Sequence, residues 1–323
     1  MNEKDISKIS RIMFSQGKTN LHILDKSFEV SKEVIRNNEI SKSDVYQKLD
    51  IKEKDLFSAN EWVEMGWFYP LHLYSEIRDQ DFIDKKVKNK IEKVIPEIKK
   101  YIKKGDFPGF FKIYKNFEIV RLPSPTKLPC ISLEKVMLDR RTCRSFAGAP
   151  VSVEDLSNIL NIGCKQALRI RRYAEEKFNE NPHLLTYSLF TPFEVYLVVL
   201  NVEGLEKGVY HYNMKNNELE IIKNGDYTNQ IYDISRKQFV DKSSFVVLIS
   251  AVYTRYMWRY RHPRAYINLL TDAGRLAHKF ILSATSLNLK NFLTPAIKES
   301  SCDKLLGLDG WKEGSLYLVA IGK

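Results

Sequence analysis

The chain has 323 residues, of which 44% are hydrophobic and 28% charged, with only 14 glycines and 11 prolines. This composition supports a sizeable core and excludes collagen-like, low-complexity and wholly disordered chains. No run of about 18 apolar residues occurs, which excludes a transmembrane helix, and the polar start MNEKDISKISRIMF lacks the apolar stretch of a signal peptide. We therefore expect a cytoplasmic protein without a membrane partner, of one large domain or two ordinary ones.

The charge of the chain is strongly basic. It has 51 lysine and arginine residues against 40 aspartate and glutamate residues, a formal net charge of +11 at pH 7. Such a charge favours anionic partners, which include nucleic acid, a phosphate-bearing cofactor and an acidic peptide. Much of the excess lies in residues 85–104, where apolar residues at helical spacing predict a helix with a solvated lysine face. Because no nucleic-acid reader motif accompanies it, we do not expect a nucleic-acid partner.

Two regions follow one another along the chain. Residues 1–120 are expected to be mostly helical and to end in a linker, because apolar residues recur at three- and four-residue spacing. The linker holds turn-forming residues in GDFPGFF and LPSPTKLP, and Pro123, Pro125 and Pro129 prevent helix formation there. Residues 121–323 are expected to form a second domain, in which helices and strands are mixed.

The elements of the second domain can be predicted one by one. A short helix is expected over residues 132–139, and a longer one after Pro150, with Ser152 as its N-cap. Residues 208–222, GVYHYNMKNNELEII, predict a hairpin with its turn at residues 215–217. An apolar stripe predicts a long helix between Leu269 and Leu287. Continuous apolar runs predict three buried strands, at residues 193–202, 244–253 and 315–322.

Two clusters of residues have the composition of a chemical site. The first is RRTCRSF, residues 140–146, whose guanidiniums and hydroxyl can cradle a phosphate; in so basic a chain it is equally a salt-bridged surface. The second is WRYRHPRAY, residues 258–266. A tyrosine beside cations ionises or relays a proton more readily than a free phenol, whereas the alternative is cation–π and ion-pair contact at the start of a helix. The residues alone leave these alternatives open.

Several other kinds of site are not indicated. The six histidines are scattered without metal-ligand spacing, and the four cysteines lie far apart with no CxxC pair. We therefore expect no metal site and no disulfide framework, and we interpret the cysteines as free, buried thiols. Walker A, GxGxxG, GxSxG and HExxH motifs do not occur, which disfavours P-loop NTPases, Rossmann dehydrogenases, α/β-hydrolases and zincins.

Several stretches in order resemble one known family. RRTCRSFAGAPVSVEDLSNIL resembles the opening of the flavin-dependent nitroreductase superfamily. FEVYLVVLNVEGLEKGVYHYN resembles a stretch of its SagB-type dehydrogenase branch, which includes the azoline oxidases of thiazole- and oxazole-modified peptide pathways, and the segment from RYMWRYRHPRAY to the closing SLYLVAIGK resembles the ending of that branch. The resemblance spans residues 120–323. It implies an α+β, nitroreductase-like FMN-binding fold, a mostly antiparallel sheet wrapped by helices, in a homodimer with FMN at the subunit interface.

The same resemblance assigns residues to a site. Arg259 and Tyr260 match a Lys-Tyr pair near the substrate of azoline oxidases. Tyr260 is thus the expected proton-transfer residue, whereas Arg259 is always protonated and can only hold the tyrosinate or the substrate. The expected cofactor-binding residues are Arg140, Arg141, Thr142, Arg144, Thr186, Ser188, Pro295, Ala296 and Lys323. The arginines, Thr142 and Lys323 match positions around the phosphate and ribityl chain of FMN, and the others match positions beside the flavin ring.

The function implied by the resemblance is that of an FMN-dependent oxidoreductase in peptide natural product biosynthesis. It would dehydrogenate a heterocycle, azoline to azole, or a related residue in a ribosomal or carrier-bound peptide, next to other peptide-modifying enzymes. Two alternatives stay open. One is a catalytically degenerate subunit of the same fold that binds or scaffolds a precursor peptide or a partner enzyme, and the other is a general NAD(P)H nitroreductase.

Overall fold

The computed structural model describes residues 109–126, 129–180, 192–259, 265–310 and 312–323, and for residues 178–180 and 257–259 it describes the backbone alone. The helical region expected over residues 1–120 lies outside the described residues as far as residue 108. The expected boundary between the two regions therefore stays a prediction. None of the helices in the described part is both long and apolar enough to span a bilayer.

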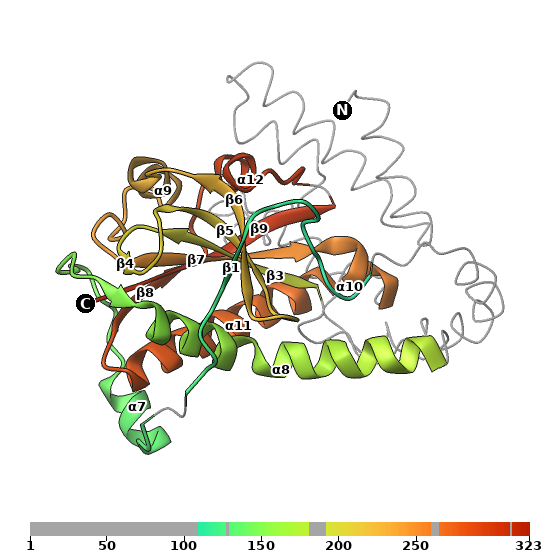
Figure 1. The fold of residues 1–323 in the computed structure, drawn as a ribbon, viewed down its shortest axis with the longest axis horizontal. Coiled ribbons are helices and arrows are strands. Elements are labelled where there is room, and N and C mark those ends of the chain that lie inside the picture. Colours follow the sequence, from blue (N-terminus) through green and yellow to red (C-terminus); the bar gives the residue numbers. More distant parts are fainter. Residues whose placement is uncertain (1–108, 127–128, 181–191, 260–264, 311) are drawn as a thin grey trace, which may run out of the picture. The chain divides into compact units, whose positions relative to one another are not determined.

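A seven-stranded antiparallel sheet forms the centre of the described domain (Figure 1). Its strands are β1 (Ile119–Arg121), β3 (Phe193–Val199), β5 (Gly208–Asn213), β6 (Glu218–Asn224), β7 (Phe245–Val252), β8 (Lys290–Thr294) and β9 (Glu313–Gly322). They lie in the order β1-β6-β5-β3-β7-β9-β8, and every pair of neighbours is antiparallel. A second, two-stranded sheet pairs β2 (Val151–Ser152) with β4 (Val202–Glu203) in parallel.

Helices cover both faces of the large sheet, so the domain has three layers (Figure 1). The described helices are α7 (Leu133–Asp139), α8 (Val153–Glu180), α9 (Thr228–Ile234), α10 (Tyr253–Arg259), α11 (Ala265–Ser286) and α12 (Glu299–Leu306). The long helices α8 and α11 pack on one face and form the larger core with it, whereas α9 and α12 pack on the other. The Phe280 ring of α11 packs directly against the α8 backbone at Gly163, where a Cβ would lie 2.4 Å from that ring.

The elements of this domain confirm most of the sequence expectations. The three apolar runs are the central strands β3, β7 and β9, the hairpin is β5–β6, and the apolar stripe is α11. Ser132 caps α7, and the Ser152 hydroxyl accepts a hydrogen bond from the backbone of Asp155 at 3.1 Å. All four cysteines are free as expected, but only Cys164 and Cys302 are buried. The expectation of buried thiols is wrong for Cys130, which lies exposed in the segment before α7.

Strand β3 is buried on both faces, and this determines where its polar residues lie. Phe193 and Val195 face α8 and α11, whereas Tyr196 and Val198 face α9 and α12. Side chains alternate along a strand, so Glu194 projects from the same face as Tyr196. A carboxylate and a phenol thus lie inside the fold at the end of the sheet where β3 begins and β7 ends.

Candidate functional site

The arginine cluster after α7 runs along the edge of the large sheet. The helix ends at Asp139, and Thr142 then pairs with Asn291 of the edge strand β8. The backbone N–H of Cys143 donates to the carbonyl oxygen of Asn291 at 2.7 Å, and that of Ala147 donates to the carbonyl oxygen of Lys323 at 2.6 Å. The cluster and the last residue of the chain, expected together at a phosphate, therefore lie at the same end of the sheet.

The cations of this cluster have no carboxylate partner among the described residues, although Nη1 of Arg141 donates to the carbonyl oxygens of Leu138 and Arg140. Arg141, Arg144 and Lys323 are exposed and Arg140 is half-buried, and among the described residues no carboxylate forms an ion pair with any of the four. The hydroxyl of Thr142 lies 3.5 Å from a guanidinium nitrogen of Arg140. Guanidiniums without a carboxylate partner, next to a hydroxyl, are well suited to a phosphate group.

Asn291 adds a polar group that the sequence did not single out. Its side chain is 2% exposed, and its Nδ2 donates to Oγ1 of Thr285 on α11 at 3.0 Å. Its Oδ1 is buried and has no hydrogen-bond partner in the described part of the chain. A buried acceptor without a donor is costly, and a ligand hydroxyl such as those of a ribityl chain has the donor it lacks. The residues present thus fit a ligand with both a phosphate and hydroxyls.

The segment expected beside the flavin ring follows the same strand. Pro295 and Ala296 are exposed directly after β8. Pro295 lies four positions after Asn291, about 13 Å along the strand, a separation that an elongated ligand could span. Pro295 has no N–H, and the N–H of Ala296 donates to the Thr294 hydroxyl at 3.0 Å. The N–H groups of Ile297 and residue 298 donate to backbone carbonyls, so this segment offers a ligand no free backbone donor between residues 295 and 298.

The expected catalytic pair follows α10. This helix begins directly where β7 ends, and Arg259 is its last residue, of which the backbone alone is described. Tyr260 lies outside the described residues, and so do Thr186 and Ser188 of the expected flavin loop. The roles given to these four residues from the sequence therefore stay predictions.

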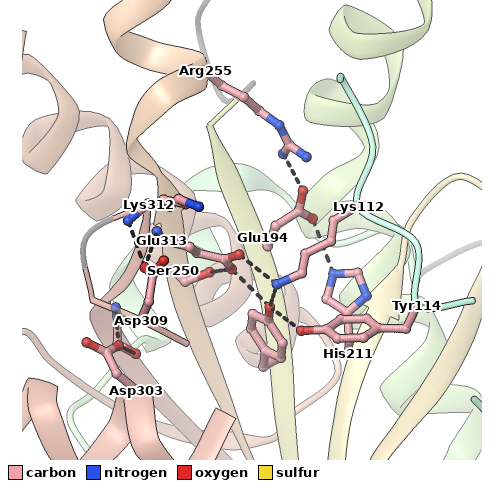
Figure 2. A network of polar contacts seen from close by, with 12 residues as sticks. Lys112, Tyr114, Glu194, His211, Ser250, Arg255, Asp303, Asp309, Lys312 and Glu313 are labelled. Atoms are coloured by element: carbon pink, nitrogen blue, oxygen red, sulfur yellow. Dashed lines mark hydrogen bonds and ion pairs between the residues drawn. The ribbon is translucent and has the colours of Figure 1, made fainter. Parts of the chain in front are cut away.

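A buried charge network occupies the sheet end from which α10 leaves (Figure 2). Glu194 of β3 is its centre and makes ion pairs with Arg171 of α8 and Arg255 of α10. His211 of β5 donates to Glu194 at 3.3 Å and lies 2.7 Å from Glu220 of β6. Burial alone raises the pKa of Glu194, but the two guanidiniums and the His211 ring hold that pKa well below its usual range. Burial lowers the pKa of His211, and its bonds to the two carboxylates raise it above 6.5 overall.

A second buried group adjoins this network (Figure 2). The ammonium of Lys112 donates to the hydroxyl of Tyr196 and to Glu313, each at 2.7 Å. Tyr196 in turn donates to Glu313 at 2.9 Å, and Ser250 donates to the same carboxylate at 2.6 Å. Burial and the Glu313 charge raise the pKa of Tyr196 far above its usual range, so its phenol stays protonated at neutral pH.

The network and the arginine cluster lie at opposite ends of β9. Glu313 begins that strand and Lys323 follows its last residue, a separation of about 33 Å along the chain.

The sequence resemblance covered Glu194, Tyr196 and His211 without giving them a role. Their position inside apolar runs was a usable signal, because charged side chains in a buried strand need partners.

Comparison with known proteins identifies the family. The sequence model described as the Nitroreductase family matches residues 137–323, which is more than half of the chain. The chain belongs to the nitroreductase family. This confirms the resemblance and the α+β fold seen in the sequence, and it agrees with FMN as the expected cofactor. A nitroreductase-like structure from Anabaena variabilis has the same fold, with a TM-score of 0.54 and 22% identity over 69% of this chain and 46% of that one.

Two relatives with trifolitoxin in their names come from Rhizobium leguminosarum bv. trifolii. The trifolitoxin operon protein TfxC is 29% identical over 269 residues, 81% of this nitroreductase-family chain and 73% of TfxC. The trifolitoxin-processing protein TfxB is 31% identical over 142 residues, 40% of this chain and 36% of TfxB. These relatives support the peptide-modifying branch that the sequence resembles. The match to TfxC is longer than the family domain and takes in part of the region before residue 137.

Proposed function

We propose that this protein is an FMN-dependent oxidoreductase that dehydrogenates a heterocycle, azoline to azole, or a related residue in a ribosomal or carrier-bound peptide. The observation that carries the proposal is the set of cations without a carboxylate partner in the described part of the chain, Arg140, Arg141, Arg144 and Lys323, beside β8. Membership of the nitroreductase family supports the redox chemistry, and the similarity to TfxC supports a peptide substrate.

The residues of the cluster would hold the cofactor by its phosphate. Arg140, Arg144 and Lys323 would pair with the phosphate, the Thr142 hydroxyl would bond the phosphate or the ribityl chain, and Pro295 and Ala296 would lie against the ring. When bound, FMN supplies the acceptor for a hydride from the azoline carbon. These residues orient the ring and leave proton removal to other groups.

Proton transfer is assigned to Tyr260. Conversion of an azoline to an azole removes two hydrogens, one as the hydride and one as a proton, and the aromatic product favours the reaction. Tyr260 would accept the proton, and the permanently charged Arg259 would stabilise its phenolate or hold the substrate.

We also propose a homodimer, supported by an exposed apolar surface on α7 next to the cations: Leu133, Met137 and Leu138 are 67%, 58% and 63% exposed. Other peptide-modifying enzymes are expected as partners.

The test is turnover of a defined peptide. The purified protein is incubated in air with FMN and a synthetic peptide that contains one thiazoline, and mass spectrometry follows the loss of two hydrogen atoms. We expect the loss with the wild type and none with Tyr260→Phe, which should still bind FMN. Turnover by Tyr260→Phe at the wild-type rate would remove the assigned proton acceptor, and no turnover by a wild type loaded with FMN would remove the azoline reaction.

One observation favours a second function, a subunit of the same fold that binds or scaffolds a precursor peptide or partner enzyme without catalysis. After β8, Pro295 has no backbone N–H to offer a flavin nitrogen, and the N–H groups of residues 296–298 are already hydrogen-bonded. This function predicts peptide binding that survives Arg140→Ala and Tyr260→Phe with unchanged pathway output. If these variants abolish output while binding persists, the scaffold function is wrong.

A further inference from the structure

Helix α10 is tied to the sheet by a buried ion pair. Of its described side chains, Arg255 and Tyr256 are buried, and Arg255 is the charged one. Tyr256 packs in the core that α8 and α11 share with the sheet, whereas Arg255 pairs with Glu194 of β3. Helix α10 follows directly on β7, and Glu194 lies on the neighbouring strand β3, opposite Ser250 of β7. The ion pair between Arg255 and Glu194 therefore joins the first turn of α10 to β3.

The carboxylate that receives Arg255 is itself fixed by other elements. Glu194 is 1% exposed, and it accepts from Nη1 of Arg171 on α8 at 3.3 Å and from Nε2 of His211 on β5 at 3.3 Å. Arg171 also donates to the carbonyl oxygen of Phe193, at the start of the same strand. The position of Glu194 is therefore set by α8, β3 and β5, independently of α10.

The network continues to the segment that precedes β1. Glu220 of β6 accepts from the ring of His211 at 2.7 Å, from Asn213 at 3.0 Å and from the backbone N–H of Tyr114 at 3.2 Å. Residues before the 137–323 family match thus take part in the same buried network. Among the described residues, Glu194 keeps one guanidinium and the His211 ring as partners when either arginine is removed.

We infer that Arg255 is a positioning residue, whose ion pair with Glu194 fixes the orientation of α10 and hence the place of Arg259 at its end. Arg259 follows one helical turn after Arg255, about 6 Å along the axis. The charge-assisted bond between a guanidinium and a carboxylate is directional, whereas apolar packing is not, so the ion pair specifies one orientation of the helix. The inference rests on the proposed function, since that function assigns Arg259 to the substrate or to the proton acceptor.

Two matched variants test it. Arg255→Met and Arg171→Met each remove one guanidinium from the same carboxylate, but only the first lies on α10. Amide hydrogen exchange is measured on both, and it needs neither FMN nor a substrate. We expect Arg255→Met to raise exchange in residues 253–259 at least about tenfold, and Arg171→Met to raise it around residue 171 and the start of β3 while α10 keeps its protection. The conservative Arg255→Lys should restore most of the protection of α10.

Each outcome bears on the inference separately from the proposed function. Equal exchange of α10 in the two methionine variants, or unchanged exchange in Arg255→Met, would show that α10 is held by other contacts and would overturn the inference. If Arg255→Met does not fold, the comparison is made between Arg255→Gln and Arg171→Gln, and only the first must then loosen α10. With the thiazoline peptide, Arg255→Met should lower kcat about tenfold or more at unchanged FMN content, whereas Arg171→Met should not. Failure to bind FMN would remove the proposed function and leave the exchange result standing.

Discussion

The Glu194→Gln variant tests the buried network most severely, because it removes a charge and keeps the shape of the side chain. It leaves Arg171 and Arg255, which are 0% and 4% exposed, without their carboxylate. Removal of one partner from a buried ion pair costs about 3–5 kcal/mol. A domain of this size loses about 2–4 °C of Tm for each kcal/mol, so we expect Tm to fall by about 6–20 °C.

The assay is thermal and urea unfolding of the variant beside a matched control, Glu175→Gln. Glu175 pairs with Lys215 at 3.0 Å, but both side chains are more than one-third exposed, and such pairs contribute about 0–1 kcal/mol. We expect the double variant Glu194→Gln, Arg255→Met to regain part of the lost stability, because one of the two uncompensated guanidiniums is removed. Equal destabilisation by Glu194→Gln and Glu175→Gln would refute the reasoning.

Three further predictions follow from individual contacts. The pKa of His211 is raised in the folded state, so its protonated ring stabilises the fold below pH 6.5, and this stabilisation is lost as the pH rises through the folded-state pKa. The free energy of unfolding, measured by urea titration, should therefore fall as the pH rises through that range. His211→Gln should abolish this dependence of the free energy of unfolding on pH. Arg144→Ala should weaken FMN binding about 10- to 100-fold but should weaken the binding of riboflavin, which lacks the phosphate, only little. The distant surface variant Arg121→Ala serves as the control. Equal effects of Arg144→Ala on the two ligands would exclude a phosphate contact. Gly163→Ala should destabilise by about 1–3 kcal/mol because its Cβ would meet an α11 ring at 2.4 Å, whereas Gly274→Ala, which has open space, should be neutral or stabilising in the same unfolding assay.

The central elements were predictable because their sequence pattern reflects their burial. Strands β3, β7 and β9 are covered on both faces, so each is a continuous apolar run, and α11 carries an apolar stripe because one face packs on the sheet and α8. The helix starts at Ser132 and Ser152 were predictable from local capping chemistry. The short edge strands β1 and β8 were not predicted, because three and five residues carry too little pattern.

The polar parts of the site were predictable only by resemblance or not at all. The arginine cluster was recognised from its motif, but its contact with Asn291 joins residues almost 150 positions apart in the chain. Glu194 finds its partners 23, 17 and 61 residues away. No local pattern encodes such distances, since they follow from the order of the strands and from helices crossing the sheet.

The central claim is that the cations beside β8 bind the phosphate of FMN, and equilibrium dialysis against FMN with an absorbance spectrum of the retained protein tests it most directly. We predict a yellow protein with a flavin spectrum and about one FMN per chain, and a clear loss of both in Arg140→Ala, Arg144→Ala. A folded wild-type protein that stays colourless in excess FMN, or a double variant that retains the cofactor as tightly as the wild type, would contradict the claim.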